Sequence, residues 1–158
     1  MPQPDYRALA ELRYQIRRFL HFSEQAARNA HIEPRQHQFL LALKGLPQGL
    51  RPSIGTLADR LQIRPHSAVE LVNRLAKSGF VRRRQDSEDG REVLLMLTAK
   101  GEAILRELSV HHRAELRSAG PTLMRALNAV LRPPGKAKIH KTKIHKTMSN
   151  KAKKVKEL

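Results

Sequence analysis

The 158-residue chain contains no cysteine and no tryptophan, and aromatic residues make up only 4% of it. Without cysteine there is no disulfide, no thiolate metal site and no thiol-based oxidant sensor. No apolar run approaches the roughly 20 residues of a membrane-spanning helix. The start, MPQPDYRALAEL, also lacks the apolar core of a signal peptide. We therefore expect a cytoplasmic protein with no membrane partner.

The motifs of common enzyme classes are missing as well. The sequence has no glycine-rich phosphate loop and no convincing Ser/His/Asp or paired-carboxylate arrangement. Glu107 and His111 stand four residues apart, which puts two metal ligands on one helical face. The tight spacing of a zinc motif is absent, however, and the adjacent His112 falls on an apolar stripe, where a packed or dimer-interface histidine is more common. We expect no enzyme, no cofactor and no metal site.

Acidic residues are scarce: the chain has 14 of them and 31 lysines and arginines, so its net charge is +17. Such an excess indicates a polyanionic partner. Residues 1–135 contain 19 arginines and three lysines, whereas residues 136–158 contain nine lysines and no arginine. This change from arginine to lysine suggests that the two segments have different origins. We expect residues 1–131 to fold as one domain, and residues 132–158 to be a lysine-rich, disordered tail with too little apolar content for a core.

Three readings of this tail stay open. It adds nonspecific phosphate contacts, or it is an appendage without a selected role, or its repeated KIHKT pentapeptides (138–142 and 143–147) bind metal weakly. A basic tail helps every DNA sequence about equally, so it supplies no specificity.

Helical periodicity organises the first half of the chain. Apolar residues recur every three or four positions over residues 5–30, from Leu9 and Ile16 to Ala27, and predict one long amphipathic helix. Pro34 is a good first-turn residue for a second helix that runs to Lys44. Ser53 is a natural N-cap for a third, short helix.

A fourth helix follows closely and has two candidate starts. In one, Pro65 is the first helical residue and Arg64 precedes it as a poor cap. In the other, Ser67 and Glu70 form a capping box, and Glu70 then folds back onto the backbone. The buried stripe of Ala68, Leu71, Val72 and Leu75 is the same in both, and Gly79 ends the helix.

Two strand-like segments, FVRRR and REVLLMLT, come next, joined by the polar turn QDSEDG, with Val93, Leu95 and Leu97 alternating toward one face. Thr98 is expected to cap a helix of roughly 20 residues. Pro121 is expected to interrupt it, and a shorter helix then spans 123–131. The fold class is therefore mainly α with a small β-hairpin (α+β).

A short helix, a tight turn, a second helix and a charged hairpin make a winged helix-turn-helix. In that arrangement the second helix enters the DNA major groove and the hairpin reaches the flanking backbone or minor groove. Side chains on the outer face of this unit have donors and acceptors suited to base edges and phosphates. The DNA-contact candidates are Ser53, Arg64, His66, Ser67, Glu70, Asn73, Arg74, Arg82, Arg84, Asp89 and Arg91.

With these parts placed, the chain resembles the MarR-type transcriptional regulators over roughly residues 10–131. The resemblance is carried by LADRLQIRPHSAVELVNRLAKSGFVRR, by the wing ending Asp89-Gly90-Arg91, and by Leu97-Thr98-Ala99-Lys100-Gly101. It implies a homodimer on pseudo-palindromic double-stranded DNA, with residues 5–33 and 99–131 as dimerisation helices and 34–98 as the DNA-binding winged helix. It also implies that Asp89 orients Arg91 for the minor groove.

The resemblance further implies a repressor released by a small anionic or phenolic ligand, bound between the dimerisation helices and the winged helix. Arg17, Arg18, His21, Phe22 and His37 are the candidate lining, although a role in the core or dimer interface fits them equally. The alternative function is a largely nonspecific architectural DNA-binding protein driven by the tail. A specific regulator acting at the nucleoid is the leading hypothesis.

Overall fold

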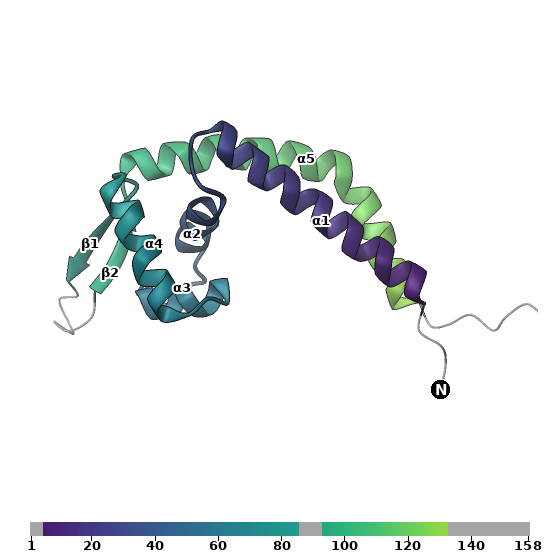
Figure 1. The fold of residues 1–158 in the computed structure, drawn as a ribbon, viewed down its shortest axis with the longest axis horizontal. Coiled ribbons are helices and arrows are strands. Elements are labelled where there is room, and N and C mark those ends of the chain that lie inside the picture. Colours follow the sequence, from purple (N-terminus) through teal and green to yellow (C-terminus); the bar gives the residue numbers. More distant parts are fainter. Residues whose placement is uncertain (1–4, 86–92, 133–158) are drawn as a thin grey trace, which may run out of the picture.

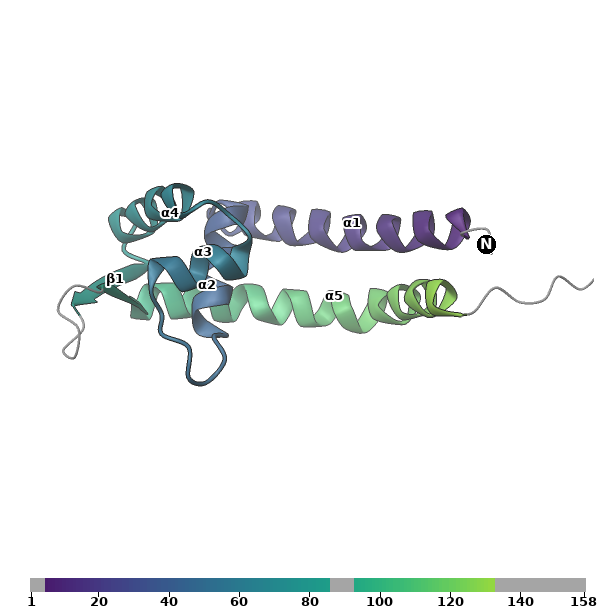
Figure 2. The same cartoon turned by 90° about the horizontal axis from the view of Figure 1, so that it is seen from below.

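Two long antiparallel helices, α1 (Tyr6–Asn29) and α5 (Ala99–Leu131), run side by side, and the other elements gather at one end of the pair (Figures 1 and 2). The computed structural model describes residues 5–85 and 93–132. The predicted DNA contacts Asp89 and Arg91, and the predicted tail from residue 133, lie outside the described residues. Between the long helices come, in chain order, α2 (Pro34–Lys44), α3 (Ile54–Leu61), α4 (Pro65–Lys77), β1 (Val81–Gln85) and β2 (Val93–Leu97).

The two strands pair antiparallel, with Val81 opposite Leu97 and Gln85 opposite Val93. The mainly helical fold with a small hairpin is therefore as predicted. One detail of the hairpin differs. Leu95 is buried, but Val93 is exposed and Leu94 is buried instead, because the Leu95 amide donates to the Pro52 carbonyl at 2.8 Å and Ser53 bridges to Leu94. The segment before α3 thus pairs with the free backbone edge of β2, a contact that simple alternation does not anticipate.

Side-chain caps fix where three of the helices begin. The Asp5 carboxylate accepts from the Ala8 amide at 3.0 Å, the Ser53 hydroxyl from the Thr56 amide at 3.3 Å, and the Thr98 hydroxyl from the Gly101 amide at 3.1 Å. Each satisfies a backbone N–H that has no partner within the first helical turn. The predicted caps Ser53 and Thr98 are confirmed.

Helix α5 contradicts the predicted interruption at Pro121. It continues for 33 residues to Leu131 with Pro121 inside it, and it curves over its C-terminal part (Figure 1). Proline removes only one helical hydrogen bond, and Gly120 before it has no Cβ to clash with the proline ring. Packing along α1 then holds the helix together. Despite its length, neither α5 nor any other helix in the described part of the chain is apolar enough to cross a membrane.

The main core lies between the winged helix (α2, α3, α4, β1 and β2) and the region where the end of α1 packs on α5. Its fully buried side chains come from α2, α3, α4, β2 and α5, and include Phe39, Leu57, Leu75, Leu95 and Leu108. Burying a leucine or phenylalanine contributes about 1.5–3 kcal/mol. These contacts therefore fix the position of α4 relative to the long helices.

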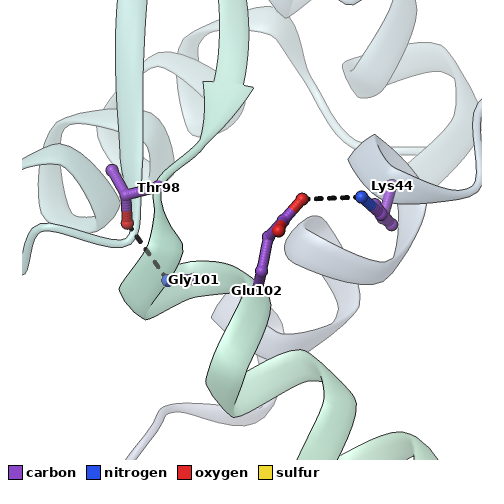
Figure 3. Close-up of polar contacts among 4 residues, drawn as sticks. All are labelled: Lys44, Thr98, Gly101 and Glu102. Carbon is purple, nitrogen blue, oxygen red and sulfur yellow. Dashed lines mark hydrogen bonds and ion pairs between the residues drawn. The ribbon is translucent and has the colours of Figure 1, made fainter.

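An exposed ion pair also ties α2 to α5. The Lys44 ammonium lies 2.6 Å from a carboxylate oxygen of Glu102, one turn beyond the Thr98 cap (Figure 3). The hydrogen bond from Lys44, together with its charge, lowers the pKa of the Glu102 carboxyl below its usual value. The pair therefore persists through neutral pH and is lost as the pH falls through that lowered pKa.

The predicted single apolar stripe of α1 divides into two. Ser23 and Ala27 are buried and Phe19 is half-buried, but Leu9, Ile16 and Leu20 are 41–46% exposed. Helix α5 likewise exposes Leu116, Met124, Leu127 and Leu131. Within the single chain, these apolar side chains of the two long helices face solvent.

Candidate nucleic-acid interface

The turn between α3 and α4 is built by a left-handed residue. Gln62 has φ +53°, and the Ile63 amide donates to the Ala58 carbonyl at 3.0 Å, which closes the end of α3. Leu57 and Ala58 of α3 pack with the buried face of α4. This is the helix-turn-helix arrangement, with α4 in the position of the second helix.

Helix α4 begins at Pro65, and this decides between the two predicted starts. Arg64 occupies the N-cap position without a side-chain capping bond. The capping-box reading, in which Glu70 folds back onto the backbone, is wrong because Pro65 already starts the helix one turn earlier. Glu70 is instead exposed, with its carboxylate 3.3 Å from the Nε2 atom of His66.

The two faces of α4 are as predicted. Ala68, Leu71, Val72 and Leu75 are buried. The opposite face presents His66, Val69, Glu70, Asn73, Arg74 and Lys77, all exposed. A helix whose exposed side carries donors, acceptors and cations has the chemistry needed for base edges and phosphates.

Two more candidates on this face, besides His66 and Glu70, already have partners within the chain. The Arg83 guanidinium donates to Oδ1 of Asn73 at 2.5 Å, and Arg74 lies 3.6 Å from the Glu33 carboxylate at the start of α2. Both contacts are exposed. They orient Asn73 and Arg74 before any ligand arrives.

The arginines of β1 divide between the two faces of the hairpin. Arg82 and Arg84 stand opposite Met96 and Leu94, whereas Arg83 stands opposite Leu95 and reaches α4. The sequence prediction selected Arg82 and Arg84 as candidates and left out Arg83. Strand alternation could have corrected this, since Arg83 shares the face of Val81, the residue by which β1 enters the core.

Val69 is a further surface residue that the prediction did not select. It is an apolar side chain, 38% exposed, among polar neighbours on the outer face of α4. A thymine methyl group is the base feature that such a side chain matches. Its signal in the sequence is the placement of a valine among polar positions of an amphipathic helix.

Ser53, Arg64 and Ser67 lie at the edges of the interface. The Ser53 hydroxyl is used in capping α3 and also bonds to the Thr56 hydroxyl at 3.1 Å. Arg64 and Ser67 are exposed and border a hollow of about 660 Å³ between α1, α2, α3 and α4. Its other lining includes Leu20, Arg35, Ile63 and Leu71.

The predicted ligand-pocket residues are only partly together. Arg17, Arg18, His21 and Phe22 line one open hollow of about 530 Å³, with Glu115 of α5 across from them. His37 does not line this hollow. The larger hollow beside α4 lies between a long helix and the winged helix, but none of the predicted lining residues borders it, because residues far apart in sequence form its walls.

His37 is buried against a second histidine. Its ring stacks on that of His112, with the centroids 4.9 Å apart, and Phe22 meets His112 edge-on. Burial and, secondarily, the nearby His112 lower the pKa of His37 to about 4. Its Nδ1 atom is buried without a hydrogen-bond partner in the structure. The ring is therefore neutral near pH 7.

His112 of α5 is hydrogen-bonded to Ser23 of α1, which in turn bonds to α2. Its Nδ1 atom lies 2.5 Å from the Leu108 carbonyl, which only accepts, so Nδ1 carries the proton. In the neutral ring Nε2 then accepts from the Ser23 hydroxyl of α1 at 2.7 Å. Gln38 of α2 donates to the same hydroxyl at 3.5 Å. The predicted packing role of His112 is confirmed, and within residues 5–85 and 93–132 no group of three or more His, Asp or Glu side chains could hold a metal ion.

Comparisons with known proteins agree with this geometry. The sequence model of the MarR family matches residues 32–92, from just before α2 to just before β2. No curated protein matches the chain in sequence. Among solved structures, AbsC, a MarR family transcriptional regulator from Streptomyces coelicolor, is similar with a TM-score of 0.64 and 21% identity, over 84% of this chain and 94% of that one.

Two more solved structures have the same fold. Wild-type MarR from E. coli, in its apo form, gives a TM-score of 0.61 at 20% identity, over 84% of this chain and 99% of its own. A mutant of S. aureus MepR bound to an oligodeoxyribonucleotide gives 0.56 at 20% identity, over 75% of this chain and 91% of its own. The matched segment and the shared fold lead to one conclusion: residues 32–92 match the MarR family, and the chain has the winged helix-turn-helix fold of the MarR-family structures.

Proposed function

We propose that the chain is a sequence-specific DNA-binding transcriptional regulator that places α4 in the major groove. The observation that carries this proposal is the exposed face of α4, where Asn73, Arg74 and Lys77 project beside the arginines of β1. Cations supply affinity for phosphates, whereas amide groups read base edges. The MepR complex with an oligodeoxyribonucleotide supports the same use of this fold.

The regulator is a homodimer in this proposal. The exposed apolar side chains of α1 and α5 support it, because monomeric proteins rarely leave large contiguous apolar surfaces in water. Two copies of α4 would then read half-sites about one helical turn of DNA apart. Arg91 of the wing, oriented by Asp89, is proposed to reach the flanking minor groove, with the tail from residue 132 adding contacts that do not depend on sequence.

Repression released by a small anionic or phenolic ligand is the proposed mode of regulation, exerted in the cytoplasm at the nucleoid. Both hollows combine apolar walls with guanidinium groups. Titration with benzoate tests them separately, using Arg17→Gln for the predicted hollow and Arg35→Gln for the one beside α4. Benzoate weakens DNA binding of the wild type, and the variant in the occupied hollow loses that response. An unchanged response in both variants would exclude both hollows.

Fluorescence anisotropy tests the central function. Labelled duplexes from upstream of the gene for this protein are compared with scrambled duplexes of equal length and composition. A specific regulator prefers one upstream duplex by roughly a thousandfold or more. Equal binding to both kinds of duplex would reject a sequence-specific function, and it would favour an architectural role instead.

A further inference from the structure

The contact between the wing and α4 bears on how the protein distinguishes bases. Arg83 of β1 donates from Nη2 to Oδ1 of Asn73, at 2.5 Å, and both side chains are otherwise exposed. A guanidinium has only donors. The atom that it meets must therefore be the amide oxygen of Asn73, which settles which end of that amide is which.

We propose that Arg83 is a specificity-determining positioning residue, which fixes the side-chain amide of Asn73 so that its NH₂ group is presented to the DNA. The proposal rests on the function proposed above. With Oδ1 held toward β1, the two N–H donors of the amide point away from Arg83. A donor directed at a base edge selects an acceptor there, such as N7 or O6 of guanine, N7 of adenine or O4 of thymine.

An unrestrained asparagine would behave differently. Its amide rotates by half a turn at little cost and exchanges donor with acceptor, so it accommodates either kind of base edge. The bond from Arg83 is charge-assisted and stronger than one between neutral groups. It therefore opposes that rotation and removes the ambiguity before DNA is bound.

A phosphate contact is the competing role for Arg83, and it predicts another outcome. Phosphate contacts carry no sequence information, so losing one weakens binding to all sequences about equally and lowers the salt slope by about one. Arg82 and Arg84 provide matched controls. They lie on the same strand, they are also exposed, and strand alternation puts them on the opposite face from Arg83.

The test selects binding sites from a pool of randomised duplexes. It compares the full-length wild type with Arg83→Met, Asn73→Ala, the double variant and Arg84→Met. Thermal melting first shows that each protein is folded. We expect Arg83→Met and Asn73→Ala to relax discrimination at the same position of each half-site, by about tenfold. The double variant should relax it no further. Arg84→Met should weaken binding evenly and leave the preferences intact.

Two results would overturn the inference alone. In one, Arg83→Met keeps the wild-type base preferences; in the other, it relaxes positions that Asn73→Ala does not. A wild type that enriches no sequence at all would reject the proposed function and the inference together. The two failures are thus distinguished within one experiment.

Discussion

His37 is a titratable side chain enclosed in the fold. It is 2% exposed, its ring stacks on His112, and its pKa is lowered from 6.5 to about 4. Above pH 6.5 the ring is neutral in both the folded and the unfolded chain. As the pH falls below 6.5, only the unfolded chain takes up the proton, so stability decreases until the folded form also titrates near pH 4.

This linkage gives a prediction for His37→Gln. Glutamine does not titrate, so the variant should lack the part of the pH dependence that His37 causes between pH 6.5 and 4, roughly 3 kcal/mol in the free energy of unfolding. Urea unfolding at several pH values and one protein concentration measures it. His111→Gln, at an exposed position of α5, is the control. Parallel pH profiles for the wild type and His37→Gln would contradict the account.

At the residue scale the sequence predicted which α4 positions face outward, but not what they contact. The 3.6-residue period separates Asn73 from Val72 without any tertiary information. That Asn73 meets Arg83 depends on how β1 returns across α4, and the pairing of Arg74 with Glu33 depends on the position of α2. The same limit explains His37, which shares no stripe with His112 in the sequence and stacks on it only in the fold.

At the scale of the elements, α5 begins where its Gly101 lies close to the backbone of Phe80. A Cβ added to Gly101 would lie 2.1 Å from the Phe80 carbonyl oxygen, a backbone atom at the start of the wing. Thr98 donates to the Gly79 carbonyl at 2.6 Å at the same junction. The hairpin, the turn after α4 and the start of α5 therefore meet where only glycine fits.

Gly101→Ala is accordingly expected to destabilise the protein by about 1–3 kcal/mol, the usual cost of overpacking. Gly55→Ala is the matched control, because its added Cβ would meet only the Ser53 hydroxyl oxygen at 3.9 Å and alanine favours the helix. Chemical unfolding of both variants checks the contrast. If Gly101→Ala proves as stable as Gly55→Ala, the close approach does not exist in solution.

The sequence identified every helix and strand of the described residues, yet it misjudged one interruption. Caps and turn residues such as Ser53, Thr98 and Gly79 are local signals, which is why the element boundaries near them were predictable. Pro121 was taken as a helix stop by the same local logic. The helix continues because Gly120 relieves the clash and α5 packs along α1, and the second of these causes is tertiary.

For the whole molecule, the exposed apolar side chains of the long helices predict the effect of an added charge. Leu127→Glu places a carboxylate where we propose that a second copy packs, and it should weaken dimerisation at least tenfold, because burying an unpaired charge is costly. Leu50→Glu, in the loop before α3, is the control. Sedimentation equilibrium distinguishes monomer from dimer, and an unchanged dimer of Leu127→Glu would place the interface elsewhere.

The whole-molecule charge was informative about the partner but not about specificity. A net charge of +17 predicts a polyanion. Only the order of helix, turn, helix and hairpin indicated a reader of DNA sequence, and the geometry adds which side chains stand together on that surface. The dimer, the bound DNA and the effector involve molecules beyond one chain, so they stay proposals.

The central claim is that the winged helix, and not the lysine-rich C-terminal segment, supplies DNA specificity. The most direct test is the ratio of affinities for the preferred upstream duplex and a scrambled duplex, measured across salt concentrations for the full chain and for one ending at Leu131. We predict that truncation weakens both affinities and reduces the salt slope, while the ratio stays roughly a thousandfold or more. A ratio that collapses toward one on truncation would contradict the account.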